Sequence, residues 1–160
     1  METYIGTKCI KAKPMTRLEY NQLRGWELPP NENGSDEGYL VEYLDSPNSN
    51  VEGYKGYVSW SPKNVFECAY KPTRQKVTQE HLESIITDKQ FHRLTGTLTV
   101  CVLTLRNGFV VTGESACADP AIYDQEIGER FAYKNAFDKL WMLEGYVLKN
   151  ELHLLNQCGG

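Results

Sequence analysis

The sequence lacks the patterns by which membrane proteins and most enzyme classes are recognised. Its 160 residues contain no apolar run close to the roughly 18 needed to cross a bilayer. The first fifteen residues have no apolar segment of the kind found in signal peptides. GxSxG, Walker A, GxGxxG and HExxH motifs are also missing. We therefore expect a protein that stays inside a cell and is not an enzyme.

Cysteine and histidine are too scattered to predict a metal site. The five cysteines include no CxxC pair, and the three histidines stand far apart. Since a structural zinc site needs closely spaced ligand pairs, we predict no metal, no cofactor and mostly buried free thiols. A nucleophilic Cys117 or a carboxylate pair among Glu42, Asp45 and Glu67 is a minor alternative, because no spacing supplies the base or the pairing.

A basic surface is missing as well. The chain has 17 Lys and Arg against 21 Asp and Glu, a net charge of −4. Binding to the phosphate backbone of DNA or RNA requires a cationic surface, so we expect no generic nucleic-acid binding. A small anionic ligand needs only a few local donors and stays compatible with this charge.

The apolar content of 41% predicts a packed globule, and the pattern of expected strands and helices places it in the α+β class. Residues 1–72 are rich in Tyr and Trp and predict an antiparallel β domain with two short helices. We expect a helix from Arg17 to Gly25, with Thr16 and Glu19 forming a capping box. We expect a second helix over 62–70, with Ser61 as its N-cap. The expected strands are residues 4–12, 39–44 and 57–60.

The rest of the chain predicts a helical linker over 73–90 and a hairpin–helix module over 91–160. Asn107-Gly108 between two β-branched runs is typical of a two-residue hairpin with a type I′ turn. Asp119 is the expected cap of a long helix ending at Gly145. Apolar residues cover most of the circumference of that helix, which indicates burial on more than one side and suggests an oligomerisation unit.

Residues 1–72 also carry side chains suited to a nucleotide-like ligand. Aromatic rings stack on bases, arginines bind phosphates, and a helix N-terminus such as that at Ser61-Pro62-Lys63 offers N–H donors. On composition alone, the favoured interpretation is simpler: Tyr and Trp fill the core and surface of a small β domain. The candidate ligand-binding residues are Arg17, Asn21, Arg24, Trp26, Tyr39, Trp60, Ser61 and Lys63.

Two resemblances to known families favour the ligand-binding interpretation over the structural one. Residues 91–151 contain VLTLRNGFVVTGESACADP and LEGY, and they resemble the podovirus gene-forty-nine and gene-sixty-six protein family. That resemblance implies a small phage accessory protein. Residues 1–72 more distantly resemble the Thoeris anti-defence sponge family, second type, through Arg24-Gly25-Trp26 and through Trp60-Ser61-Pro62 followed by a helix to Ala69.

The sponge resemblance has departures that bear on the ligand. Lys63 stands where that family has a serine, Phe66 where it has an aspartate, and a closing tryptophan is replaced near Pro72. A lysine beside a helix N-terminus favours an anion, which includes cyclic dinucleotides as well as ADP-ribose derivatives. The ligand can therefore differ from that of the family.

The resemblances imply a phage anti-defence protein that binds and sequesters a nucleotide immune messenger without cleaving it. The messenger would be of the cyclic ADP-ribose type or a cyclic dinucleotide, bound by a homo-oligomer in the host cell cytoplasm. Trp26 and Trp60 would stack on a base, Arg17, Arg24 and Lys63 would neutralise phosphate, and Asn21, Tyr39 and Ser61 would donate or accept hydrogen bonds. The alternative is a phage accessory protein that inhibits or recruits a host protein through its aromatic surface.

Overall fold

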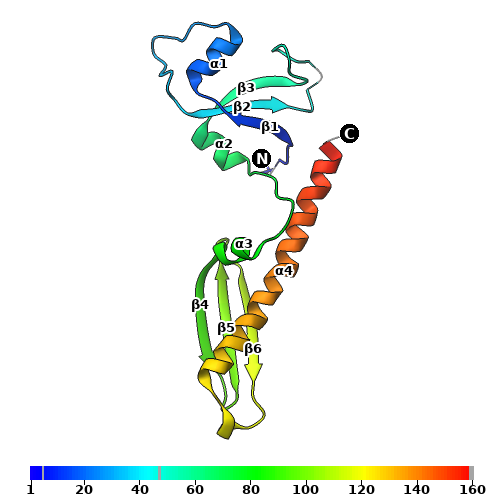
Figure 1. Cartoon of the computed structure of the whole chain (residues 1–160). Helices are drawn as coiled ribbons and strands as arrows, with labels where there is room; N and C mark the ends of the chain where they lie inside the picture. Colours follow the sequence, from blue (N-terminus) through cyan, green and yellow to red (C-terminus); the bar gives the residue numbers. More distant parts are fainter. Residues whose placement is uncertain (5, 47, 159–160) are drawn as a thin grey trace. The chain divides into compact units, whose positions relative to one another are not determined.

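The chain folds into two compact units, each built on its own three-stranded antiparallel sheet (Figure 1). A computed structural model describes residues 1–4, 6–46 and 48–158. One unit comprises Met1–Thr73 with the end of the chain from His153, and the other comprises Arg74–Leu152. Because both units combine antiparallel strands with helices, the predicted α+β class is confirmed.

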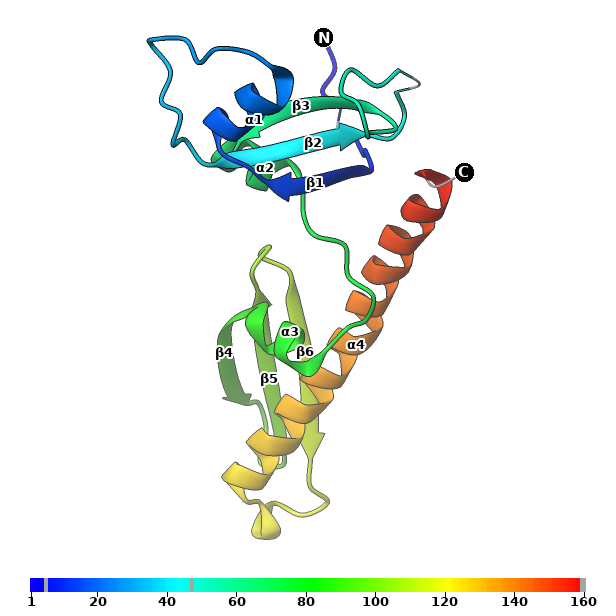
Figure 2. The ribbon, with the colours of Figure 1, turned by 45° about the horizontal axis from the view of Figure 1, so that its top comes forward.

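The first unit carries one helix on each face of its sheet, as Figure 2 shows. Tyr20 of α1 packs on Leu40 and Val58 at one face, and Phe66 of α2 stacks on Tyr39 at the other. Neighbouring residues of a strand point to opposite faces, so these contacts place the two helices on opposite sides. The elements are β1 (Ile10–Pro14), α1 (Arg17–Arg24), β2 (Gly38–Tyr43), β3 (Tyr57–Pro62) and α2 (Lys63–Ala69).

The ends of α1 follow the prediction. The Thr16 side chain accepts from the Glu19 backbone N–H, and the Glu19 carboxylate accepts from the Thr16 backbone N–H at 2.7 Å. Gly25 ends the helix with a φ of 66°, a left-handed conformation that glycine adopts without strain. The capping box is therefore confirmed.

The first strand begins later than predicted. The expected strand over 4–12 includes residue 5, which lies outside the described residues, and β1 runs from Ile10 to Pro14. Ile10 pairs with Tyr43, the last residue of β2, so the ladder between β1 and β2 ends at this pair. The pairing, rather than the local alternation, sets the start of β1.

The predicted cap at Ser61 is wrong. Ser61 pairs with Tyr39 and Pro62 pairs with Gly38, so β3 continues to Pro62. The N-cap is Pro62, which has no side chain able to cap, and helix α2 begins at Lys63. The Lys63 N–H is taken by the Glu37 carbonyl at 3.1 Å. Continued strand pairing thus displaces the helix start by one residue.

The second unit has a strand that the sequence did not predict. Within the expected helical linker over 73–90, only Gln79–Ser84 is helical (α3), and Ile86–Arg93 forms β4. Strand β4 pairs along β5 (Leu98–Leu105), which also pairs with β6 (Val110–Ala116). Most β4 side chains are polar and exposed, so the segment lacks the alternating pattern that marks a half-buried strand.

The β5–β6 hairpin is confirmed, but its turn is not type I′. A type I′ turn needs positive φ at both central residues, and of the pair Asn107-Gly108 only Gly108 has it, at 83°. Gly108 N–H bonds the Leu105 carbonyl, and Leu105 N–H bonds the Phe109 carbonyl. The loop is therefore three residues long, a type I turn followed by a left-handed glycine.

The long helix α4 (Gln125–Cys158) begins later and ends later than predicted. Asp119 caps only the short 3₁₀ turn η1 (Pro120–Ile122), and the Asp124 carboxylate accepts from the Ile127 N–H at 3.0 Å. Gly145 does not end the helix, because a glycine weakens a helix by about 1 kcal/mol without breaking it. The buried stripe of α4 includes Ala132, Ala136 and Leu140, which pack on Cys101 and Leu103 of β5.

Candidate functional site

Arg17 and Trp60, two of the predicted ligand-binding residues, meet on the α1 face of the first sheet. The Arg17 guanidinium lies 5.0 Å from the centroid of the Trp60 ring. Its Nη2 also donates to Glu32 Oε1 at 2.8 Å, and this hydrogen bond raises the pKa of Arg17 and lowers that of Glu32. Trp60 Nε1 donates to the Met15 carbonyl at 2.9 Å. Both side chains are therefore already occupied by contacts within the unit.

The i, i+4 and i+7 spacing of Arg17, Asn21 and Arg24 predicts one polar face on α1, with Leu18 and Leu23 buried. Asn21 does not lie on such a face. It is 2% exposed, with Nδ2 donating to the Glu27 carbonyl at 3.5 Å and Oδ1 without a partner in the structure. Its neighbour Tyr20 is also buried, while Leu18 and Leu23 are exposed. Helix α1 therefore buries the side that carries Tyr20 and Asn21, and not the side that carries the two leucines. The reason is that the aromatic Tyr20 is the larger group to bury.

The half-buried Arg24 and the exposed Trp26 form a pair at the C-terminal end of α1. The Arg24 guanidinium lies 4.2 Å from the Trp26 ring centroid, and Arg24 Nη1 donates to the Tyr20 hydroxyl at 3.3 Å. Trp26 is 52% exposed and meets Tyr20 edge to face. This pair leaves one cation and one aromatic face accessible to solvent.

Tyr39, Ser61 and Lys63 lie on or beside the opposite, α2 face. Tyr39 stacks on Phe66 with centroids 4.1 Å apart and donates to Glu67 Oε1, which raises the pKa of Tyr39. Lys63 Nζ pairs with Glu37 Oε2 at 2.7 Å, and the pKa of Glu37 is lowered by that bond. A cavity of about 310 Å³ includes Tyr39 and Lys63, but the carboxylates of Glu19 and Glu37 also line it.

The eight predicted residues therefore fall on two sides of the sheet instead of converging. Strand pairing decides this, because Tyr39 and Leu40 alternate across β2 and Ser61 and Trp60 alternate across β3. Two of the three predicted phosphate-binding cations are paired with carboxylates, and helix α2 begins at an already bonded N–H. Their roles in ligand binding stay predictions.

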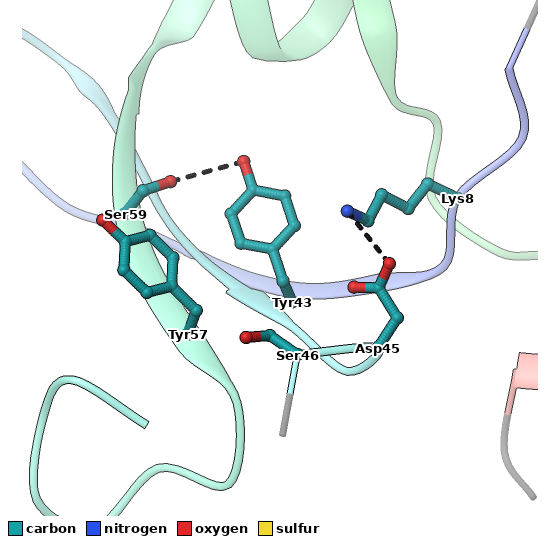
Figure 3. A pocket seen from close by; sticks show the side chains of 6 residues that line it. All are labelled: Lys8, Tyr43, Asp45, Ser46, Tyr57 and Ser59. Atoms are coloured by element: carbon teal, nitrogen blue, oxygen red, sulfur yellow. Dashed lines mark hydrogen bonds and ion pairs between the residues drawn. The ribbon is translucent and has the colours of Figure 1, made fainter. Parts of the chain in front are cut away.

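A more open hollow lies on the α2 side of the sheet, at the end of β2 and β3 (Figure 3). Its volume is about 540 Å³, within the range of small-molecule sites. The Tyr43 and Tyr57 rings stand 6.4 Å apart and are tilted by 38°, and the Ser59 hydroxyl donates to the Tyr43 hydroxyl. We call this hollow the tyrosine pocket; it is lined by Lys8, Tyr43, Asp45, Ser46, Tyr57 and Ser59.

The charge of the tyrosine pocket comes from one ion pair. Lys8 Nζ lies 3.1 Å from Asp45 Oδ2 and 4.6 Å from the Tyr43 ring centroid. Both charged side chains are largely exposed, and such pairs contribute only about 0–1 kcal/mol to stability. A ligand anion can therefore replace Asp45 as the partner of Lys8 at small cost. The aromatic content of β2 and β3 was the available sequence signal for Tyr43 and Tyr57.

The minor catalytic alternatives find no constellation in the described residues. Glu42 accepts from the Lys55 and Gly56 N–H groups, which lower its pKa, while Asp45 pairs with Lys8 and Glu67 bonds Tyr39. The three carboxylates thus have separate partners. The Cys117 thiol donates to the Asp119 carbonyl at 3.3 Å, and no hydrogen bond joins it to a basic side chain in the described part of the chain.

Comparison with known proteins finds one similarity, which lies in the second unit. Residues 77–152 match the model of the Phage protein (N4 Gp49/phage Sf6 gene 66) family, and this range lies within the unit Arg74–Leu152. The match confirms the resemblance predicted for residues 91–151 and supports a bacteriophage origin and a phage accessory role. No curated protein and no solved structure matches the chain. The sponge resemblance of residues 1–72 is not shown by these comparisons. No helix in the described part of the chain is long and apolar enough to cross a membrane.

Proposed function

We propose that this phage accessory protein binds and sequesters a nucleotide immune messenger, and that the ligand occupies the tyrosine pocket. The proposed ligand is a cyclic ADP-ribose-type molecule or a cyclic dinucleotide, held without cleavage in the host cytoplasm by a homo-oligomer. The phage family match supports the accessory role. The tyrosine pocket is the observation that carries the ligand class.

The chemistry of the pocket suits a base joined to a phosphate. Tyr57 is 46% exposed, so its ring offers a face for stacking, and base–aromatic stacking contributes about 1–3 kcal/mol for each base. Lys8 is a cation held beside Tyr43. The hydroxyls of Ser46 and Ser59 line the pocket, where they can form hydrogen bonds with sugar or phosphate oxygens. This assignment moves the stacking role from Trp60, which fills the other face, to Tyr43 and Tyr57.

Binding and release experiments test the proposal. The full chain is incubated with a panel of cyclic dinucleotides and cyclic ADP-ribose isomers, and affinity is measured by titration calorimetry. Heat denaturation followed by chromatography of the supernatant is expected to return the ligand intact. Recovery of a cleavage product would identify a hydrolase, and the absence of binding to every compound would reject the messenger as ligand.

Two aromatic variants locate the site. Tyr57→Ala is expected to weaken binding at least tenfold, or about 1.4 kcal/mol, through loss of the stacking face. Trp26→Ala is the matched control, because Trp26 is similarly exposed but lies outside the pocket. If Trp26→Ala weakens binding and Tyr57→Ala does not, the ligand lies at the Arg24–Trp26 pair and the pocket assignment is contradicted.

The second candidate, binding of a host protein, is favoured by a different surface. Leu18, Leu23 and Trp26 are exposed on and just beyond α1, and exposed aromatic and aliphatic groups are typical anchors of protein interfaces. A host protein retained by the native chain and by Tyr57→Ala, but lost with Trp26→Ala, would support this candidate. Retention by both variants would contradict it.

A further inference from the structure

The outward face of α4 carries apolar side chains that the second unit does not cover. The helix packs its Ala132–Ala136–Leu140 stripe on the sheet. On the opposite side, Ile127 is 48% exposed, Phe131 is 45% exposed and Trp141 is 41% exposed. Met142 and Tyr146 are exposed on the flank of the helix, and all of these residues belong to the unit Arg74–Leu152.

The residues of this face follow a heptad spacing. Going along the helix, the positions are separated alternately by four and three residues, which is the a/d spacing of a coiled-coil seam. At 1.5 Å per residue the seam is about 27 Å long. We call this set the outer seam; its members are Ile127, Phe131, Lys134, Asp138, Trp141 and Gly145.

The centre of the outer seam is charged and self-complementary. Lys134 and Asp138 are 64% and 53% exposed in their side chains, and their ion pair of 2.6 Å lies within one helix turn. A parallel pair of helices would set Lys134 against Lys134 and Asp138 against Asp138, which is repulsive. An antiparallel pair sets a positions against d positions, so the opposite charges meet.

The register of an antiparallel pair follows from the numbering. With a two-fold axis at the level of Ala136, Lys134 of one copy faces Asp138 of the other. Phe131 then faces Trp141, and Ile127 faces Gly145, whose missing side chain leaves room for the isoleucine. Every layer thus joins complementary groups, and a two-fold axis makes each contact twice.

The geometry points to self-association of this protein through the outer seam of α4, with the helices of two copies antiparallel. A second copy is the occupant because the seam complements itself in charge and in size about one axis. The two sheets then lie on the outer sides of the helix pair. This contact involves only the second unit and does not depend on the tyrosine pocket or on any ligand.

Charge-exchange variants of the full chain test the seam by analytical ultracentrifugation. The native chain is expected to be a dimer. Lys134→Asp gives an all-negative centre and Asp138→Lys an all-positive one, and each is expected to raise the dimer dissociation constant at least tenfold. Mixing the two variants, or combining both changes in one chain, is expected to restore dimers. Circular dichroism confirms that the variants are folded.

Asp88→Lys on β4 is the matched control, because it makes the same charge change at an exposed position away from α4 and is expected to leave the dimer unchanged. A native chain that stays monomeric up to about 100 µM, a range that reaches weak micromolar affinities, would overturn the inference. A dimer that neither single variant weakens would also overturn it, since the contact would then use another surface.

Discussion

Gly113 of β6 lies directly against the backbone of α4 at Ala136. A Cβ atom at Gly113 would overlap the main-chain nitrogen of Ala136 and the carbonyl oxygen of Ala132. On either side of this contact, Asn135 Nδ2 donates to the Glu114 carbonyl at 2.8 Å and Lys139 Nζ to the Thr112 carbonyl at 2.7 Å. The absence of a side chain at Gly113 therefore sets how closely the helix approaches the sheet.

Gly113→Ala is expected to destabilise the protein by at least about 2 kcal/mol, because neither backbone can move aside without loss of packing. Urea unfolding followed by circular dichroism measures the change. Gly96→Ala is the matched control, since its Cβ would meet only Pro120 at an ordinary 3.4 Å. It is expected to change stability by less than about 1 kcal/mol. Equal effects of the two changes would contradict the close approach.

Gly108→Ala tests the turn of the β5–β6 hairpin. Nothing lies within 4 Å of a Cβ at Gly108, so the only cost is the left-handed φ of 83°. That conformation costs a residue with a side chain about 1–2 kcal/mol, and asparagine less. The native chain is therefore expected to have the highest unfolding midpoint, Gly108→Asn an intermediate one and Gly108→Ala the lowest. No difference among the three would show that the loop adopts another turn.

Trp60→Ala is expected to destabilise the first unit by about 3–5 kcal/mol. Trp60 packs on the Tyr20–Leu40–Val58 core and donates to Met15, so its loss leaves both a cavity and an unpaired carbonyl. Trp26→Ala, at a half-exposed position, is expected to cost less than about 1 kcal/mol. Thermal unfolding of the native chain and of the two variants measures these differences in stability. A small effect at Trp60 would return it to consideration as a ligand-stacking residue.

The surroundings of Glu144 predict that the second unit loses stability in acid. Partial burial by itself would raise the pKa of Glu144, but hydrogen bonds from Arg74 at 2.8 Å and from His81 at 2.8 Å outweigh it and lower that pKa. A carboxyl with a lowered pKa in the folded state stabilises the fold above its unfolded pKa, about 4.3. That stabilisation is lost as the pH falls through the folded value.

Glu144→Gln removes that pH dependence. The variant is expected to be less stable than the native chain by about 1–3 kcal/mol at pH 7, with the difference shrinking as the solution is acidified. Urea midpoints between pH 7 and pH 3 measure it. Gln in place of Glu83, an exposed carboxylate on α3, is the control and is expected to show no such trend. A difference that stays constant with pH would mean that the charge of Glu144 is not involved.

Local signals predicted several parts of the fold correctly. The Thr16–Glu19 capping box, the Gly25 stop and the hairpin around Asn107-Gly108 all depend on residues a few positions apart. Such interactions are encoded in short stretches and are readable there. Strand β4 was missed because a polar edge strand is stabilised by its pairing with β5. The extension of α4 past Gly145 was missed because Glu151, in that extension, pairs with Arg74 far away in the sequence.

The candidate site was less readable than the fold. Arg17 with Glu32 and Lys63 with Glu37 are pairs joined across loops, and no local pattern shows that these cations are already neutralised. Lys8 reaches Tyr43 and Asp45 from before β1, so the tyrosine pocket exists only once the chain has folded. The Tyr and Trp content indicated aromatic surfaces but not which face each ring would occupy.

The sequence by itself determined the α+β class, the helix cap at Thr16 and the hairpin at Gly108, because each follows from composition or from neighbours within a few residues. Only the tertiary structure decided that Trp60 faces the core, that Tyr39 and Ser61 lie on the other side, and that Tyr43 and Tyr57 share an open hollow. The reason is register: in a sheet, the pairing of strands assigns every side chain to one face, and a shift of one residue reverses the assignment.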